Sequence, residues 1–333
     1  MKREWMLRLH LNRSHIERLS LYLVVLLLCA LLFPTTSFAS TFLEDSDLTR
    51  DEIIRIAEAY KNHVWVAAEE NIYHGVDPHR VSVDTPDRDT FTGWPSWKGW
   101  LTGENTGIPY KWGGFSCIPE SEYRGESDKD YKFDEGIEKG KYAGDMNCVE
   151  PSSQKYTVGV DCSGFVSRCW RLPRKQSTRS LPDISQPVKF EDLKKGDILN
   201  CCNAHVMLFK EFVTLENKLP GQTRIRIYHA SGIDWKVSEW EYILKTIEKK
   251  EEEFRGVRYE TNEVILEVVG RVASDGTVEP ISTGYCDNHE YVPRTYFTER
   301  SVPFIETPRG ITTVSCTIAL IVFVTLLLRK KTK

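Results

Sequence analysis

The sequence predicts an α+β domain in which a helix that carries a cysteine packs on a central antiparallel sheet, with a membrane-spanning helix near the C-terminus. Three observations predict this class. Apolar residues recur at helical spacing over residues 162–170. Residues 205–209 and 224–229 have the continuous and the alternating apolar patterns of strands. An uncharged apolar run occupies residues 311–328.

Size and charge narrow the class of protein. The chain has 333 residues, of which 41% are hydrophobic, so it can bury a sizeable core as one decorated domain or two small ones. Its formal net charge is -4, which lacks the bulk basicity of a nucleic-acid-binding protein. We therefore expect no nucleic-acid partner.

The N-terminal segment has the composition of a secretory signal. Five basic residues fall within the first eighteen, an apolar run follows over residues 19–33, and Ser37 and Ala39 supply the small residues of a cleavage site. We predict a signal peptide over residues 1–39, cut after Ala39. An uncleaved N-terminal anchor is the alternative, because the basic head is long.

The C-terminal segment predicts an anchor. The run 311–328 is long enough to span a bilayer, and a basic tail follows it directly at 329–333. Positive residues stay on the cytoplasmic side, so the folded part is expected outside, on the periplasmic or wall side of the cell membrane. A buried core helix is the alternative reading of this run. Residues 273–310 are then a spacer between the anchor and the folded domain.

Residues 40–272 are predicted to form the folded domain. A capping-box pattern at Thr49 begins an amphipathic helix expected over residues 50–67. Two irregular stretches, 75–107 and 115–158, interrupt the domain. The first contains three tryptophans that either line a groove or pack a long loop, namely Trp94, Trp97 and Trp100.

Cys162 is the candidate nucleophile. It begins its predicted helix, where unpaired backbone N–H groups favour a thiolate. His205 begins one strand and His229 lies on the apolar face of another, so neighbouring strands can bring both rings to the helix start. We expect His205 to be the general base and His229 to orient it. The backbone N–H of Cys162 is expected to form an oxyanion hole, with the Tyr110 hydroxyl nearby.

Each of these residues also has a structural explanation. A lone buried cysteine usually acts as a small hydrophobic residue, and a histidine at a strand end usually has a structural role. A helix-start cysteine followed by two strand-borne histidines is, however, the order that thiol catalysis needs. The combination therefore favours catalysis over packing.

Five motifs in this order resemble the signatures of the NlpC family of papain-like cysteine peptidases. They are Tyr110-Lys111-Trp112-Gly113-Gly114, Asp161-Cys162-Ser163-Gly164-Phe165-Val166, the segment 193–199 with Gly196-Asp197, His205-Val206, and Tyr228-His229-Ala230-Ser231. The resemblance covers about residues 53–272, with long interruptions. It implies a papain-like fold and a catalytic set of Cys162, His205 and His229.

The resemblance also implies a substrate. Members of that family commonly cut the bond between γ-D-glutamate and a diamino acid in bacterial cell-wall stem peptides. We therefore expect a membrane-anchored cysteine peptidase that acts on peptidoglycan stem peptides without a cofactor. In related members the residues flanking the nucleophile hold the free amine of the peptide, which makes Asp161 and Ser163, with Tyr110, candidate substrate contacts. An amidase or acyltransferase acting on another amide, and a non-catalytic wall-binding module, are the alternatives.

The nine cysteines suggest an oxidising compartment, because seven of them lie between the two apolar ends. Cys117 and Cys148 lie near the two ends of the 115–158 insertion, and we predict that they pair. Cys201 and Cys202 are predicted to pair with Cys169 and Cys286 in an order that stays open. Cys162 is then the one unpaired thiol.

A zinc site at Cys201-Cys202-Asn203-Ala204-His205 is the other reading of the adjacent cysteines. Neighbouring cysteines make a poor pair of tetrahedral ligands, and binding His205 would remove the general base. We therefore expect no metal.

Overall fold

The computed structural model describes residues 48–80, 82–87, 99–122, 131–145, 153–213, 220–280 and 287–296. The predicted signal peptide (1–39), membrane anchor (311–328) and tail (329–333) lie outside these residues. Trp94 and Trp97 lie outside them as well.

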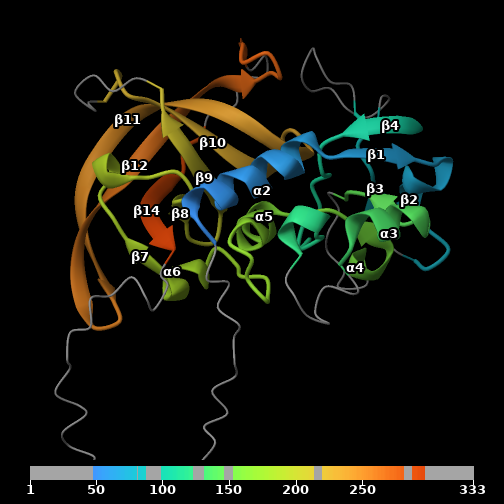
Figure 1. The fold of residues 1–333 in the computed structure, drawn as a ribbon, viewed down its shortest axis with the longest axis horizontal. Coiled ribbons are helices and arrows are strands. Elements are labelled where there is room, and N and C mark those ends of the chain that lie inside the picture. Colours follow the sequence, from blue (N-terminus) through green and yellow to red (C-terminus); the bar gives the residue numbers. More distant parts are fainter. Residues whose placement is uncertain are drawn as a thin grey trace, which may run out of the picture. The chain divides into compact units, whose positions relative to one another are not determined.

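The helices and short strands lie mainly in the N-terminal half of the described chain, and the long strands lie in its C-terminal half (Figure 1). The helices are α2 (Arg50–Asn62), α3 (Phe133–Glu138), α4 (Ser153–Tyr156), α5 (Cys162–Cys169) and α6 (Leu181–Ile184), with 3-10 helices η1 (Glu69–Asn71), η2 (Pro119–Ser121) and η4 (Phe190–Asp192). The strands are β1 (Val64–Ala67), β2 (His74–Val76), β3 (Ser82–Asp84), β4 (Gly103–Thr106), β5 (Tyr142–Ala143), β6 (Thr157–Val158), β7 (Ser185–Pro187), β8 (Ile198–Cys201), β9 (His205–Phe212), β10 (Arg224–Ser231), β11 (Lys236–Phe254), β12 (Val257–Val272), β13 (Val278–Pro280) and β14 (Glu290–Tyr296).

The main sheet has eight strands in the order β13-β12-β11-β10-β9-β8-β14-β7, and all its neighbours are antiparallel. An additional pairing of β12 with β14, at Val264 opposite Tyr291, closes the sheet on itself. Six strands therefore form a closed ring, with β13 and β7 as extensions. β13 and β14 lie within the segment 273–310 that was expected to be a spacer.

The β11–β12 hairpin supplies the longest strands of this sheet. Its turn is Arg255-Gly256, in which both residues have positive φ, 51° and 79°. This conformation matches the twist of a two-residue hairpin and explains the glycine. The charged run 249–253 is part of β11 and mostly exposed.

Two apolar cores lie on opposite faces of the sheet. One contains Met207, Phe209, Ile227 and Trp240, whose side chains alternate along β9, β10 and β11 with those of the other core. The other core contains residues of α2 and α5 packed on the intervening strand residues, among them Val206. Figure 1 shows α2 and α5 beside β9 and β10, with which α5 is in contact.

The predicted papain-like fold class is wrong. Strands predominate over helices in the described chain, and the sheet closes instead of serving as a central layer under helices. The prediction recognised α5 and the strands beside it, but it treated the segment after residue 272 as a spacer. Because β14 comes from that segment and pairs with both β8 and β12, the closure was missed.

The first predicted helix ends earlier than expected. Thr49 caps α2, its hydroxyl accepting a hydrogen bond from the Glu52 N–H at 3.1 Å, which confirms the predicted start. The helix ends at Asn62, and residues 64–67 form β1, paired with β4. The alternation of exposed and buried residues in β1 explains the difference, because it is a strand period.

No helix among the described residues is long and apolar enough to cross a membrane. The longest of them, α2, has 13 residues and a length of roughly 20 Å, against a hydrocarbon core of about 30 Å. The prediction of a membrane-anchored protein is corrected accordingly: the described chain contains no such helix, and the segment proposed for this role lies outside it.

Candidate functional site

The start of α5 is held by the carboxylate of Asp161, the N-cap residue. Its Oδ1 accepts a hydrogen bond from the Gly164 N–H at 2.6 Å, and its Oδ2 accepts one from the Gly113 N–H at 2.9 Å. Gly113 has a φ of 68°, in the left-handed region that glycine tolerates best. The paired glycines of the 110–114 motif therefore serve to bring a second loop to the helix start.

Gly164 lets this loop approach α5 closely. A Cβ at Gly164 would lie 2.0 Å from the Gly114 carbonyl oxygen, a distance that no side chain can occupy. Only glycine leaves room for this close approach. The loop therefore packs directly on α5, which begins at Cys162 and is buried along its whole length.

A buried arginine fixes the same helix to the same loop. The Arg168 guanidinium donates to the Phe115 carbonyl from Nε at 3.0 Å and from a terminal nitrogen at 2.7 Å, and it lies 3.5 Å from the centre of the Phe115 ring. The side chain is fully buried. It is a structural clamp that the sequence reading missed, because a lone arginine on a helix normally suggests a solvated face.

Lys175 interacts with the side chains of both polar residues that flank Cys162. Its ammonium lies 2.9 Å from Asp161 Oδ2 and donates to Ser163 Oγ at 3.2 Å. Ser163 Oγ also donates to Asp161 Oδ1 at 3.1 Å. Asp161 and Ser163 were predicted to contact substrate, and in this structure both are engaged within the chain. Their contact with a substrate stays a prediction.

The two predicted histidines lie together. His205 Nε2 and His229 Nδ1 are 3.0 Å apart, within hydrogen-bond distance, and the rings are close to perpendicular. The turn that precedes β9 explains the position of His205: Asn203 adopts a φ of 67°, and the chain reverses so that His205 pairs with Cys201. Nδ1 of His205 is then the ring nitrogen available to another group.

His229 is buried against Trp240, with ring centroids 4.7 Å apart. Trp240 is held in turn by Asp234, because its indole N–H donates to Asp234 Oδ2 at 2.7 Å. The other ring nitrogen of His229, Nε2, is buried and has no hydrogen-bond partner among the described residues. The ring orientation is therefore set by packing on one side and by His205 on the other.

Cys162 lies beside the start of β9. The thiol is buried, α5 contacts β9 and β10, and the backbone N–H of Val206 acts on the sulfur as a hydrogen-bond donor. Val206 follows His205 directly, so the sulfur lies next to the residue that carries the candidate base. Within the described residues, however, no hydrogen bond joins the thiol to either imidazole.

The resting site is electrically neutral at Cys162 and His205. Burial raises the pKa of the Cys162 thiol to about 12, and the negative charge of Asp161 adds to the effect. The Val206 and Ser163 N–H groups and the Lys175 ammonium lower this pKa by less. Burial lowers the pKa of His205 to about 4. A preformed thiolate–imidazolium pair is therefore not the resting state.

Asp287 is a charged group near His205 that sequence reasoning missed. Its negative charge raises the pKa of His205, whereas the nearby His289 lowers it. The buried carboxylate accepts hydrogen bonds from the Tyr291 hydroxyl at 2.8 Å and from the His289 N–H at 3.1 Å. The alternating Asp, His and Tyr at 287, 289 and 291 could have signalled this cluster, but the segment was assigned to a spacer.

Tyr110 is buried in the core that also contains Cys162. Its backbone N–H donates to the Trp235 carbonyl at 2.7 Å, and it forms a bridge with Val160, which lies two residues before Cys162. This placement puts Tyr110 on the strand segment next to the helix start. The contact of its hydroxyl with a substrate stays a prediction.

The prediction of disulfide bonds is wrong as far as the described residues reach. No disulfide joins any two of the five described cysteines, which include Cys169, Cys201 and Cys202. Cys169 is fully buried in α5, whereas Cys202 is exposed in the turn before β9, so that the two lie in different environments. The partners predicted from elsewhere, Cys148 and Cys286, lie outside the described residues.

Two other sequence hypotheses concern a metal site and the tryptophan cluster. In the described ranges, no three His, Cys, Asp or Glu side chains are arranged to hold a metal ion. Of the three clustered tryptophans, Trp100 is described; it is fully buried and packs edge-on against Trp65, with ring centroids 5.2 Å apart. Trp100 therefore serves as core packing and does not line an open groove.

The raised pKa of the Cys162 thiol predicts how its alkylation rate depends on pH. With its pKa raised to about 12, Cys162 in the folded protein should react with iodoacetamide at a rate that keeps rising with pH beyond 9. In the urea-unfolded chain the same residue should show an ordinary midpoint near about 8.5. Residue-resolved mass spectrometry at several pH values measures both profiles. A folded-state midpoint at or below 8.5 would contradict the neutral resting thiol.

Comparisons of the chain with protein-family models, with curated proteins and with solved structures gave no match.

Proposed function

We propose that the protein is a thiol-dependent hydrolase of amide bonds, with Cys162 as nucleophile, His205 as general base and His229 as the group that orients His205. The observation that carries this proposal is the meeting of three elements. The first turn of α5 presents Cys162 beside the first residues of β9, and β9 and β10 bring His205 and His229 within 3.0 Å of each other.

The hydrogen bond between the histidines supports the roles. If His205 donates from Nε2 to His229 Nδ1, Nδ1 of His205 carries no proton and can accept one from the thiol. The His229 ring must then carry its own proton on Nε2, next to the packed Trp240. This tautomer pair is the one that makes His205 a base.

Because Cys162 and His205 are both neutral at rest, the first chemical step includes a proton transfer between them. His205 Nδ1 takes the thiol proton as the Cys162 sulfur attacks the carbonyl carbon, so that no free thiolate has to accumulate in a site that disfavours it. The backbone N–H groups of the first turn of α5 stabilise the negative oxygen. The imidazolium then protonates the leaving amine, the C–N bond breaks and a thioester forms.

In the second half of the reaction the thioester is hydrolysed, and the proton returns from His205 to the sulfur. A water molecule attacks the thioester carbonyl and gives a proton to His205 Nδ1. The C–S bond breaks, the acid product leaves and the proton returns to the sulfur. The chain thus needs no cofactor for a complete cycle, and each proton is held by a residue already at the site.

We propose peptides of the bacterial cell wall as the substrate class. The support is the resemblance of the motifs around Cys162, His205 and His229 to those of peptidases that cut such peptides. The test is incubation of the protein with purified stem peptides and mass analysis of the products. New products of the mass expected for addition of water support hydrolysis, whereas intact peptides would refute this substrate class.

The pH dependence of kcat/KM follows from the pKa of His205. Since its pKa is lowered to about 4, the neutral base is present at all pH values above that, and kcat/KM should fall to half only near pH 4. An acid limb near the ordinary histidine value of about 6.5 would contradict a base that is neutral at rest. Stopped assays between pH 3.5 and about 8 measure this limb.

Stability has to be followed in the same experiment. A histidine whose pKa is lowered by folding takes up its proton more readily in the unfolded chain, so stability falls as the pH drops from about 6.5 toward 4. Circular dichroism at each pH separates loss of folding from protonation of the base. A fall in activity at a pH where the protein is already unfolded is not assigned to protonation of His205.

A further inference from the structure

The loop that follows α5 turns back along the helix and places Lys175 beside its first turn. Arg171, the residue after the C-cap, adopts a φ of 47°, in the left-handed region, and reverses the chain. The Gln176 N–H donates to Ser167 Oγ at 2.9 Å, and this hydroxyl donates to the Ser163 carbonyl at 2.7 Å. Ser167 is fully buried. Lys175, one residue before Gln176, is thus tied to the helix, and its side chain is 26% exposed.

Asp161 is buried, and four groups of the described chain contact its carboxylate. Oδ1 accepts hydrogen bonds from the Gly164 N–H and the Ser163 hydroxyl. Oδ2 accepts one from the Gly113 N–H and lies 2.9 Å from the Lys175 ammonium. Lys175 is the one cation in this set. A buried carboxylate is unfavourable unless its charge is balanced, so this ion pair stabilises the start of α5.

Asp161 and Lys175 act on the Cys162 thiol in opposite directions. Burial is the main cause of the raised pKa of this thiol, and the negative charge of Asp161 raises the pKa further. The Lys175 ammonium lowers it. Since Asp161 directly precedes Cys162, its charge lies next to a sulfur that has to become negative during attack. Lys175 therefore favours the attacking form of the sulfur.

The elements packed on α5 bring few other charges to this position. β9 contributes His205 and β10 contributes His229, and burial lowers the pKa of each, so both rings are neutral near pH 7. α2 contributes Tyr60, whose pKa is raised by burial. Two carboxylates of α2 are engaged with other groups, Glu52 with Arg55 and Arg171 and Glu58 with the Tyr228 hydroxyl.

We propose that Lys175 is a positioning residue of the candidate site: its ammonium holds the Asp161 carboxylate at the start of α5 and balances the charge of that carboxylate while the Cys162 sulfur attacks. The role in the reaction rests on the proposed function. The effect on the thiol does not, because it is measured with an alkylating reagent and without a substrate. A carboxylate left without its cation would disfavour both the thiolate and the negative oxygen that forms on attack of an amide.

Alkylation of Cys162 by iodoacetamide in the full chain tests the charge of Lys175. In Lys175→Met the pKa of the thiol should rise by about one unit, which lowers the thiolate fraction about tenfold at a given pH. The more basic thiolate is also the better nucleophile, so the measured rate should fall only about threefold. Lys175→Arg keeps the positive charge and should keep the parent rate. Residue-resolved mass spectrometry of the folded and the urea-unfolded protein gives the rates, and the unfolded chains should not differ.

A double variant separates the charge of Lys175 from a purely structural role. Lys175→Met combined with Asp161→Asn removes both opposing charges, and asparagine is a good N-cap residue. If Lys175 acts by balancing the carboxylate, Cys162 in the double variant should be alkylated faster than in Lys175→Met and close to the parent rate. A double variant as slow as Lys175→Met or slower would show that the charge of Asp161 is not what Lys175 balances, and would refute the proposal.

The hydrolysis of stem peptides by the same variants is the second measurement. We expect Lys175→Met to lower kcat about tenfold and to change KM by less than about twofold, because the charge acts on the reacting sulfur and oxygen. Lys175→Arg should restore kcat. If the parent protein cleaves no peptide, the proposed function fails, whereas the alkylation rates still decide the effect of Lys175 on the thiol.

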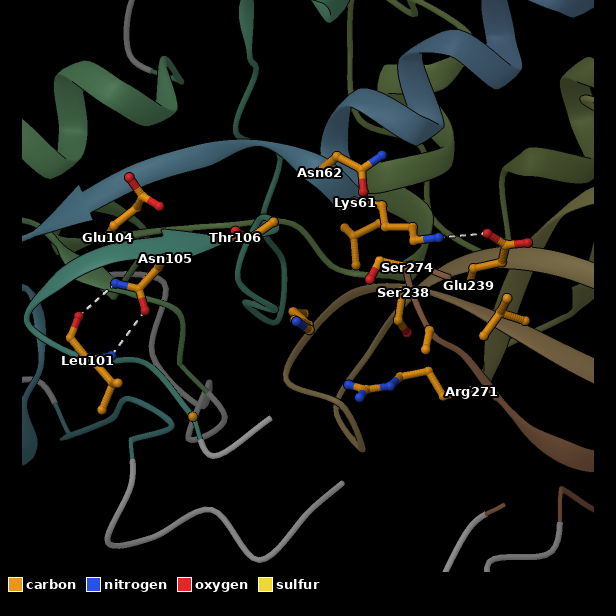
Figure 2. Close-up of a pocket in the computed structure, with 15 residues that line it drawn as sticks. Lys61, Asn62, Leu101, Glu104, Asn105, Thr106, Ser238, Glu239, Arg271 and Ser274 are labelled. Atoms are coloured by element: carbon orange, nitrogen blue, oxygen red, sulfur yellow. Dashed lines mark hydrogen bonds and ion pairs between the residues drawn. The ribbon is translucent and has the colours of Figure 1, made fainter. Parts of the chain in front are cut away.

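Lys61→Met is the matched control. Figure 2 shows the Lys61 ammonium facing Glu239, at 2.7 Å, on the wall of a cavity of about 640 Å³ that Cys162 does not line. The Lys61 side chain is 19% exposed and its partner carboxylate is buried, as in the pair of Lys175 with Asp161. Lys210 stays beside Glu239 at 2.8 Å, so the fold should persist. Cys162 in Lys61→Met should be alkylated at the parent rate.

Three further results would overturn the proposal. The first is an unchanged alkylation rate of Cys162 in Lys175→Met with the circular dichroism of the parent. The second is equal slowing in Lys175→Met and Lys61→Met, which would assign the effect to the loss of any ion pair. The third is a Lys175→Arg protein as slow as Lys175→Met. If Lys175→Met does not fold, Lys175→Gln takes its place, because its amide can still donate to Ser163 Oγ without a charge.

Discussion

Replacing Cys162 with alanine is expected to reduce amide cleavage by at least about 10⁴-fold, because the sulfur forms the covalent bond to the acyl group and no other group at the site can replace it. The alanine side chain fits the space of the thiol in the buried first turn of α5, so the fold should persist. The rate of product formation from stem peptides, measured by mass spectrometry, gives the effect.

Cys202 provides the matched control for this substitution. It is an exposed cysteine in the turn before β9, and Cys202→Ser should retain the parent rate. If Cys162→Ala retained full activity while the protein cleaved the peptides, the nucleophile assignment would be refuted. If both cysteine variants lost activity equally, a general effect of thiol removal would replace the specific role of Cys162.

Gly164→Ala is expected to produce the largest loss of stability among single-methyl additions near the site. The new Cβ would lie 2.0 Å from the Gly114 carbonyl oxygen, which is backbone and cannot rotate away. The loop and the first turn of α5 must separate, at a cost of roughly 3 kcal/mol or more in the free energy of unfolding. Urea denaturation followed by tryptophan fluorescence measures the change.

Gly221→Ala is the control for Gly164→Ala. Its φ is 78°, so alanine is disfavoured there by backbone conformation, but nothing lies within 4 Å of the added Cβ. It should cost only about 1 kcal/mol. Equal losses for the two variants would show that the close approach of Gly114 to α5 does not constrain the fold. The Gly164 variant should also lose activity, since Cys162 would move with the helix start.

The local parts of the candidate site could be predicted from the sequence. Asp161 is a good N-cap residue, and the helix begins directly after it, as predicted. The apolar pattern of β9 and the alternation of β10 predicted strands at the residues where they occur, and placed His205 and His229 on them. These predictions succeed because capping and strand periodicity depend on residues only a few positions apart.

Other parts of the site could not be predicted in this way. Lys175 reaches Asp161 and Ser163 across a loop whose path no periodic pattern describes. The raised pKa of Cys162 comes from burial, whereas the helix start alone would suggest a lowered one. Asp287 acts on His205 from a segment that was expected to be a spacer. Each of these depends on which distant segments pack together.

By itself, the sequence determined where α5, β9 and β10 begin and which of their residues carry a thiol or an imidazole. Only the tertiary structure decided that the sheet closes through β12 and β14 and that the resting thiol is neutral. The physical reason is the range of the forces involved. Helix caps and side-chain alternation act within a few residues, whereas strand closure and desolvation depend on contacts between residues far apart in the chain.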